Sequence, residues 1–500
     1  MTQQKQHSLL NRADEACDIL AKHIKKDNVI RIISHNDADG LSAAGIIARA
    51  ISEEGGKFHT TILPRLRPEI VKDLSKEKYG LFIFSDMGSA CLNLINRFNA
   101  DVIIADHHQP NTNQSDTNQP DTNQLNTNQS DTNQPDTNQP DTNQPTIDSD
   151  TNGININDSI STNENVIHVN PHLFGIDGST EISGAGTSYL TVCNLGEGKK
   201  HLAPLALVGA FGDMQGQNGF IGVNEFIVEN GKESGILEIH EDLKIVSKAQ
   251  EPLYKSLAYT FTPALPGLTG DLEGSMGFLE KMGLSYGIKF SDLEDEEKDV
   301  LKDELTKLNP QIFDEVYSIP KENPILRDLE EYAYILDACG KNKKTGLGLS
   351  IALGERGEAL DVALNLQRKY REQLIKGMEW IKREGSNKMD FMQYIYSEDK
   401  VLKSVMGTIS SVGIAAKLLP EDKPILALAR MHNDIKISGR TTRSMVEKGV
   451  NLGKALHDSS LSFGGQGGGH DIAAGAMIPY KEMDNFLNLV NDMIEHQLKH

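Results

Sequence analysis

A short acidic segment near the N-terminus carries three side chains that can bind a metal ion. His35, Asp37 and Asp39 occupy alternate positions directly after an apolar run. Gly40 is expected to break that strand, and residues 41–48 are typical of a helix. Carboxylate oxygens and imidazole nitrogens are ligands for hard and borderline divalent cations. The alternative interpretation is an acidic turn that caps the following helix.

Two further apolar segments end in residues of the same chemistry. Residues 81–85 are followed by Asp86, and residues 102–105 are followed by an Asp-His-His triplet at 106–108. The carboxyl ends of parallel strands meet at one edge of a sheet, which is where open α/β folds bind their ligands. Three strand ends of one kind argue against a purely structural role. The pattern therefore predicts a metal cluster at this edge.

Taken together, these segments resemble the motifs of the DHH phosphoesterase superfamily, whose branches include RecJ nucleases, oligonucleotide phosphodiesterases and family II pyrophosphatases. The matching motifs are His-x-Asp-x-Asp-Gly at 35–40, Ser-Asp-Met-Gly at 85–88 and Asp-His-His at 106–108. Asp213, which follows an apolar helix, is similar to the fourth motif of the family.

The C-terminal part carries the second half of the resemblance. The glycine-rich segment at 464–470 is similar to the Gly-Gly-Gly-His loop of the associated DHHA1 domain. Together the two halves cover most of residues 29–215 and 390–500. The set of motifs is specific, although any one of them alone is weak.

The resemblance implies two divalent cations, with Mn²⁺ preferred and Mg²⁺ tolerated, and a role for each motif residue. One cation would be bound by His35 and Asp37, and the other by Asp39 and His107. Asp86 would bridge them. With one more carboxylate completing the cluster, the predicted metal ligands are His35, Asp37, Asp39, Asp86, His107 and Asp213.

The same resemblance implies the catalytic and substrate-binding residues. Asp106 would orient a histidine, and His108 would contact the scissile phosphate. Arg440 supplies a guanidinium suited to bidentate phosphate contact. Glycines before a histidine let backbone N–H groups approach a ligand. The predicted substrate-binding residues are therefore Arg440, Gly467, Gly468, Gly469 and His470, with the histidine also on the phosphate.

The leading functional hypothesis is a RecJ-like, metal-dependent exonuclease that hydrolyses single-stranded DNA or RNA in repair or replication. The length and the middle region resemble archaeal RecJ-type proteins, for which the resemblance implies a link to the GINS replication complex. A second hypothesis is a replisome scaffold bound to GINS, because a relative in eukaryotic helicases lacks nuclease activity. The complete ligand set argues against a purely structural role. A small-oligonucleotide phosphodiesterase or a pyrophosphatase is disfavoured by chain length and by the glycine-His segment.

Composition and charge limit the class of protein. Five hundred residues exceed one typical hydrophobic core, so two or three domains are expected. No run of eighteen apolar residues and no apolar signal core is present, which predicts a cytoplasmic protein. The net charge of −21 argues against a broad basic surface for duplex DNA. The four cysteines form no CxxC and are typical of a reducing compartment.

Alternating apolar strands and helices predict an α/β fold. We expect a doubly wound, mostly parallel sheet at the N-terminus and a smaller α/β domain at the C-terminus. A helix opening at Gly184 has N–H groups that face either a phosphate or a packing partner. The predicted domains are 1–220 (DHH catalytic domain), 221–355 (inserted helical region), 356–386 (connector helix) and 387–500 (DHHA1 substrate-binding domain).

A low-complexity repeat at 110–165 interrupts the first predicted domain. Thr-Asn-Gln recurs seven times at intervals of five residues, beginning at position 112. The segment contains no Lys or Arg and very few apolar residues before position 147. It cannot bury enough surface to offset its conformational entropy, so we predict disorder.

Overall fold

The computed structural model describes residues 2–110, 165–217, 219–398 and 400–499. The repeat predicted to be disordered lies outside the described residues, apart from its two flanking positions. The chain divides into two compact units. The first contains the described residues up to 110, 165–239 and 317–367, and the second contains those of 240–316 and 368–499. Among the described helices, none combines the length and the hydropathy needed to span a bilayer.

The first unit is built on a five-stranded parallel sheet in the order β2-β1-β3-β4-β5. Its strands are rich in valine, isoleucine and phenylalanine, which suit a sheet that is buried on both faces. Their bounds are β1 Val29–His35, β2 Lys57–Leu63, β3 Leu81–Ser85, β4 Asp101–Ala105 and β5 Val166–Val169.

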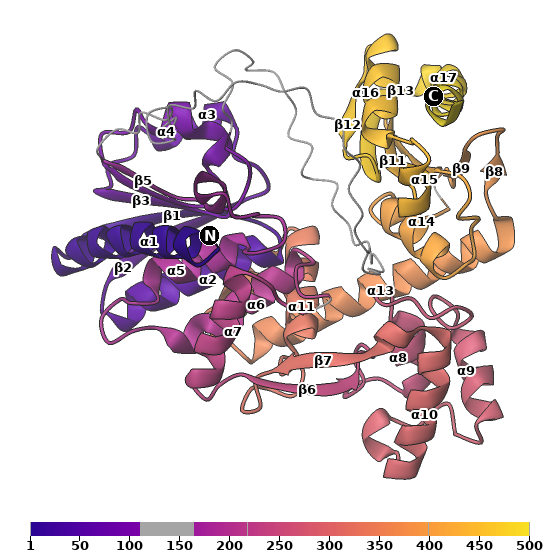
Figure 1. Cartoon of the computed structure of the whole chain (residues 1–500), viewed down its shortest axis with the longest axis horizontal. Helices are drawn as coiled ribbons and strands as arrows, with labels where there is room; N and C mark the ends of the chain where they lie inside the picture. The colour runs from indigo at the N-terminus through magenta and orange to yellow at the C-terminus, as the bar shows by residue number, and fades with distance from the viewer. Residues whose placement is uncertain (1, 111–164, 218, 399, 500) are drawn as a thin grey trace, which may run out of the picture. The chain divides into compact units, whose positions relative to one another are not determined.

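Helices cover both faces of this sheet, as Figure 1 shows. Alternate strand residues supply two separate cores: Ile32 and Ile83 belong to one, and Phe82 and Phe84 belong to the other. The larger core packs against α1 Thr2–Lys25, α2 Ala38–Glu53, α5 Gly184–Val192 and α6 Ala203–Gly212. The smaller core packs against α3 Pro68–Leu74 and α4 Leu92–Ile95.

Three more helices complete the larger core of the first unit. They are α7 Val223–Glu233, α11 Leu329–Lys341 and α12 Thr345–Ala352. The α11 helix contacts both α2 and α6, although about 130 to 300 residues of chain separate it from them. The observed sheet confirms the predicted α/β class with a parallel N-terminal sheet.

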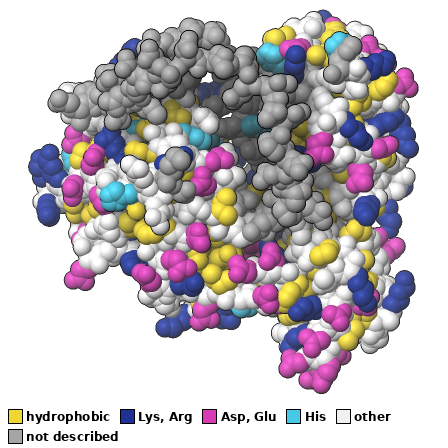
Figure 2. All heavy atoms as spheres, in the orientation of Figure 1, with side chains coloured by type: hydrophobic (Ala, Val, Ile, Leu, Met, Phe, Trp, Pro, Cys, Tyr) yellow, Lys and Arg dark blue, Asp and Glu magenta, His cyan; other side chains and the backbone are white. Residues whose placement is uncertain are grey.

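The middle region contains strands as well as helices. We expected residues 221–355 to be helical, but β6 Glu238–Leu243 and β7 Phe313–Ser318 pair in a two-stranded sheet. The helices between them are α8 Leu253–Tyr259, α9 Leu272–Lys281 and α10 Asp295–Leu308, which share a core of their own. Acidic side chains gather where α10 lies (Figure 2), and its first turn contains three acidic residues in succession.

The second unit contains a six-stranded sheet in the order β12-β13-β11-β10-β9-β8. Its strands are β8 Asn387–Lys388, β9 Gln393–Tyr396, β10 Ile425–Met431, β11 Asp434–Arg440, β12 Gln466–Gly469 and β13 Ala473–Pro479. Two cores flank it. One includes α14 Met406–Ala415 and part of α13 Glu358–Glu384, and the other includes α15 Arg443–Glu447, α16 Leu452–Ser462 and α17 Met483–Lys499.

Candidate metal centre

Three neighbouring strands of the first unit deliver polar side chains to the same edge of the sheet. His35 is the last residue of β1, Asp86 follows β3, and Asp106 follows β4. The register aligns these ends, because Ser85 is paired with both Ser34 and Ala105. Asp86 has a φ of 55°, a left-handed conformation that is uncommon for a residue with a side chain. Such backbone conformations cluster at functional sites.

The turn after β1 is held by its own side chains. Asp37 is the N-cap of α2, and its Oδ1 accepts a hydrogen bond from the Gly40 N–H at 3.0 Å. We expected Gly40 to break the strand, but it lies in the first turn of a helix that already begins at Ala38. A Cβ at Gly40 would lie 2.5 Å from the His35 carbonyl oxygen. Glycine is therefore needed for close packing of the turn against the strand.

The acidic and imidazole side chains converge around Asp86. On one side, His35 Nδ1 lies 2.7 Å from Asp37 Oδ2 and 3.6 Å from Asp86 Oδ2. On the other side, His107 Nε2 lies 3.4 Å from Asp86 Oδ1. The same nitrogen lies 3.1 Å from Asp213 and 3.8 Å from Asp39. The structure thus brings together all six residues that the sequence predicted as ligands.

The donor set fits divalent cations. Potential ligand atoms lie within 4.8 Å of one another in three groups, which are His35-Asp37-Asp86, Asp39-His107-Asp213 and Asp86-His107-His108. Both carboxylate oxygens of Asp86 are buried and accept no hydrogen bond within the described part of the chain. A buried carboxylate without a hydrogen-bond donor is costly unless a cation or a charged partner balances it. The donor set therefore suits a divalent cation that accepts both carboxylate and imidazole ligands.

The crowding of charges shifts the pKa values of the cluster in opposite directions. Burial, together with the charges of Asp86 and Asp213, raises the pKa of Asp39 well above its usual range. Burial also raises the pKa of Asp213 to about 7, although His107 opposes the shift. Burial opposes a positive charge on His35, but the Asp37 carboxylate outweighs it and raises the pKa of His35 to about 12. Without a cation, the cluster therefore retains protons that a bound metal ion would displace.

Asp39 is held by the start of another helix. Its carboxylate accepts hydrogen bonds from the backbone N–H groups of Gly184 at 2.7 Å and Ala185 at 2.8 Å. These two groups belong to the first turn of α5, where N–H groups have no partner within the helix. We expected the N–H groups at this helix start to face either a phosphate or a packing partner. In the structure its N–H groups bind Asp39 instead.

The two adjacent histidines are oriented by different groups. His107 Nδ1 donates to the Gly178 carbonyl at 2.6 Å, which leaves Nε2 facing the carboxylates. His108 Nδ1 donates to Asp106 Oδ1 at 2.8 Å. Burial opposes a positive charge on His108, but the Asp106 carboxylate outweighs it and raises the pKa of the imidazole. Asp106, which we predicted to orient a histidine, is buried beside His108.

Three residues that the sequence patterns did not point to form a hydrogen-bond network around Asp106 and His108. Asp106 Oδ2 accepts a hydrogen bond from the Ser89 N–H at 2.9 Å. Asn170 Nδ2 donates to Ser89 Oγ at 2.9 Å and to the His108 carbonyl at 2.8 Å. Ser89 Oγ also lies 2.9 Å from Nε2 of His168, whose pKa burial lowers to about 4. The available sequence signal was the position of Asn170, directly after a further apolar strand.

The predicted substrate-binding residues lie in the second unit. Arg440 is almost fully buried, and its guanidinium donates to Ser411 Oγ at 3.0 Å and to the Gly439 carbonyl at 2.8 Å. Burial lowers its pKa to about 10. The glycine segment, expected to be a loop, forms the edge strand β12, with Gly467, Gly468 and Gly469 in register with β13. His470 follows this strand and is exposed.

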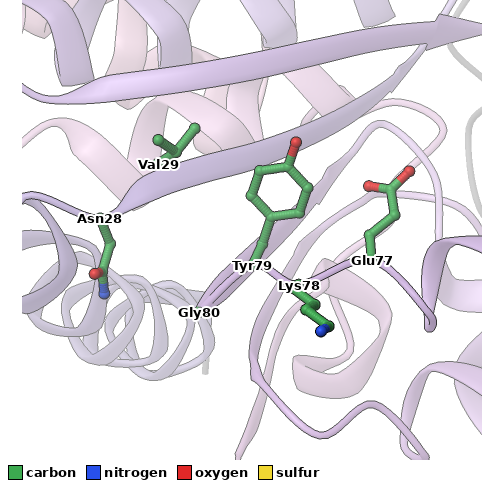
Figure 3. Close-up of a pocket in the computed structure, with 6 residues that line it drawn as sticks. All are labelled: Asn28, Val29, Glu77, Lys78, Tyr79 and Gly80. Carbon is green, nitrogen blue, oxygen red and sulfur yellow. The ribbon is translucent and has the colours of Figure 1, made fainter.

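A separate recess of about 680 Å³ opens at the start of the parallel strands of the first unit (Figure 3). Asn28 and Val29 line it at the start of β1, and residues 77–80 line it just before β3. Beside it, Glu77 accepts a hydrogen bond from the buried Arg31 at 2.7 Å. The metal-cluster residues follow the ends of these strands, so the recess belongs to the other edge of the sheet.

Three protein-family descriptions match the chain. The N-terminal domain of the DHH family matches residues 29–134, and the DHHA1 domain matches residues 398–496. Between them, the DHH-CID domain matches residues 245–311, a segment that includes α8, α9 and α10.

Several proteins share the sequence or the fold over nearly the whole chain. An uncharacterized protein of Methanocaldococcus jannaschii is 30% identical over 473 residues, which cover 94% of each chain. The Mn²⁺ complex of RecJ from Thermus thermophilus superposes with a TM-score of 0.54 at 16% identity. That match covers 97% of this chain but only 55% of the longer RecJ chain. CDC45 from Entamoeba histolytica superposes with a TM-score of 0.63 at 11% identity, covering 97% of this chain and 99% of the other.

Proposed function

Because the chain belongs to the DHH phosphoesterase superfamily, with a RecJ-like fold, we propose that it is a metal-dependent exonuclease that hydrolyses single-stranded nucleic acid in DNA repair or replication. The observation that carries this proposal is the convergence of acidic and imidazole side chains around the buried Asp86. A purely structural protein has no need of such a costly group of charges.

The proposed assignment distributes the ligands over two cations, Mn²⁺ or Mg²⁺. His35 and Asp37 would bind one, and Asp39 and His107 would bind the other. Asp86 would bridge them, since it lies near both histidines. Asp213 would complete the cluster. A pair of such ions supplies an activated water and neutralises charge that develops on the phosphoryl oxygens.

The chain's own residues orient the substrate phosphate. His108 uses Nδ1 for its hydrogen bond to Asp106, and 33% of its side-chain surface is exposed. Its remaining ring nitrogen, Nε2, is the group proposed to donate to a non-bridging phosphate oxygen. A hydrogen bond from this ring N–H to a charged phosphate oxygen is stronger than one between neutral groups. The proposed catalytic residues are therefore Asp106, as the orienting group, and His108.

The second unit is proposed to bind the nucleic-acid strand. Its contributors would be Arg440, His470 and the backbone of residues 467–469. β12 is the edge strand of its sheet, so one side of its backbone is not paired with another strand and could face a phosphate. Because Arg440 is buried and its guanidinium bonds Ser411 and the Gly439 carbonyl, its positive charge would attract the phosphate at a distance rather than through the direct bidentate contact that we expected.

The test is cleavage of end-labelled single-stranded DNA and RNA with Mn²⁺, followed by product length over time. Wild-type protein should shorten the strand progressively, and chelation of the metal should stop it. Asp86→Ala should abolish cleavage while the fold is retained, because the bridging carboxylate sets the spacing of the ions. Asp73→Ala is the matched control, since this aspartate is exposed and forms an ion pair with Lys76 at the surface. Near-normal Mn²⁺-dependent cleavage by Asp86→Ala would refute the two-metal assignment.

A replisome scaffold bound to the GINS complex is the second candidate. It is supported by the DHH-CID segment at 245–311, which contributes nothing to the metal cluster among the described residues, and by the acidic start of α10 (Figure 2). The two candidates are separable with one variant. A scaffold role predicts that Asp86→Ala binds GINS as tightly as the wild type does, whereas the nuclease role predicts loss of cleavage by the same protein.

A further inference from the structure

The last turns of α11 press against the segment that links β1 to α2. Gly340 is the closest point: a Cβ there would lie 1.8 Å from the carbonyl oxygen of Asn36 and 3.5 Å from Cα of Asp37. Asn36 Nδ2 also donates to the Gly340 carbonyl, at 3.4 Å. A glycine inside a helix costs about 1 kcal/mol relative to alanine. The close backbone approach explains why this position tolerates no side chain.

Asp337 makes the second contact, one turn earlier on the same face of α11. Its Oδ1 accepts a hydrogen bond from the Ala38 N–H at 3.2 Å. Ala38 is the first residue of α2, so its N–H has no acceptor within its own helix. The side chain of the N-cap residue Asp37 accepts from the Gly40 N–H, two residues further along the helix. Lys341 Nζ lies 2.8 Å from Asp337 Oδ2 and steadies the carboxylate.

We propose that Asp337 and Gly340 are positioning residues that hold the 35–39 segment in its metal-binding conformation. Three of the proposed ligands come from this segment, and α11 contacts its backbone between the first and the last of them. A ligand set held in place before the metal arrives loses less conformational entropy when it binds. The inference rests on the proposed metal role of the segment. It assigns a function to a helix that is about 300 residues away in sequence.

The experiment compares four variants of the full chain by Mn²⁺ calorimetry and by hydrogen exchange without metal. Asp337→Ala should weaken Mn²⁺ binding about 10-fold, at the lower end of the effect of losing a supporting hydrogen bond. The Ala38 amide should exchange faster in this variant. Asp337→Asn should restore both values, because the amide oxygen accepts the same hydrogen bond. Gly340→Ala should weaken binding in the same direction.

Gly346→Ala is the matched control, because it lies in α12 and a Cβ there meets nothing within 4 Å. It should change neither quantity. The proposal is overturned if Asp337→Ala binds Mn²⁺ as the wild type does and retains protection at Ala38, even where its melting temperature falls. A failure of the proposed function has a different signature. In that case wild-type protein binds no Mn²⁺. Loss of Ala38 protection in Asp337→Ala would still show that Asp337 holds the start of α2.

Discussion

Gly184 is a position where a very small substitution should disturb the metal centre. A Cβ at this residue would lie 2.4 Å from Asp86 Oδ1 and 2.5 Å from Asp86 Cβ. Ordinary contact begins near 3.4 Å, so Gly184→Ala requires the helix and the carboxylate to separate by about 1 Å. The Gly184 N–H also donates to Asp39 Oδ2. The displacement therefore acts on two of the proposed ligands at once.

The expected size of the effect follows from this displacement. Misplacing a reacting group by about 1 Å costs roughly 100-fold in rate. Overpacking a buried site costs about 1–3 kcal/mol of the free energy of unfolding. Gly184→Ala should therefore lower kcat for Mn²⁺-dependent cleavage of a single-stranded oligonucleotide about 100-fold, with weaker Mn²⁺ binding and a lower melting temperature. Cleavage is measured well below the melting temperature, so that unfolding does not contribute.

Gly186→Ala is the control for the steric clash that an added methyl group causes on the same helix. Its Cβ would lie 2.6 Å from Ile182 Cγ1, an apolar side chain that does not belong to the metal cluster. This variant should lose stability but retain most of its cleavage rate. Wild-type kcat in Gly184→Ala would refute the reasoning. An equal loss of activity in both variants would also refute it, because the effect would then arise from helix packing rather than from Asp86.

Three further predictions test other parts of the centre. Since the pKa of Asp213 is raised to about 7 in the metal-free protein, its contribution to stability is present below the ordinary value of 3.8 and is lost as pH rises to about 7. Mn²⁺ should correspondingly bind more tightly and release fewer protons above that pH, and calorimetry that finds no difference between about pH 6 and pH 8 would contradict this. Asn170→Ala removes the hydrogen bonds to Ser89 and to the His108 carbonyl, so kcat should fall about 10-fold with unchanged Mn²⁺ affinity, whereas a changed affinity would move this network into the metal site. His470→Ala should lower kcat/KM on oligonucleotides about 10- to 150-fold with unchanged Mn²⁺ affinity, and unaltered kinetics would remove this residue from the substrate site.

Part of the metal centre was predictable because several of its residues lie at strand ends. Each of His35, Asp86 and Asp106 directly follows or ends an apolar run that is recognisable from composition alone. Parallel strands then bring those ends to one edge by a general rule of topology. The parallel sheet itself followed from alternating strands and helices, and the structure confirms it.

The structure decided what surrounds the ligands. Gly40 was expected to end a strand but lies in a helix, because its missing Cβ serves a contact with His35. The start of α5 was open to a phosphate or a packing partner, and it binds Asp39. The glycine segment at 464–470 was expected to be a loop, yet residues 466–469 pair as the edge strand β12. In each case the local sequence indicated a backbone that another group could approach closely, but it did not indicate which group that would be.

The supporting residues were hidden from the sequence for the same physical reason. Asp337 and Gly340 meet the 35–39 segment across about 300 residues, and Asn170 meets Ser89 across 81. Periodicity reports which face of an element is buried, but it carries no information about which distant element covers that face. That choice depends on how helices and strands pack together in three dimensions. The sequence by itself thus identified the candidate ligands and the edge they share, and only tertiary packing determined what holds them there.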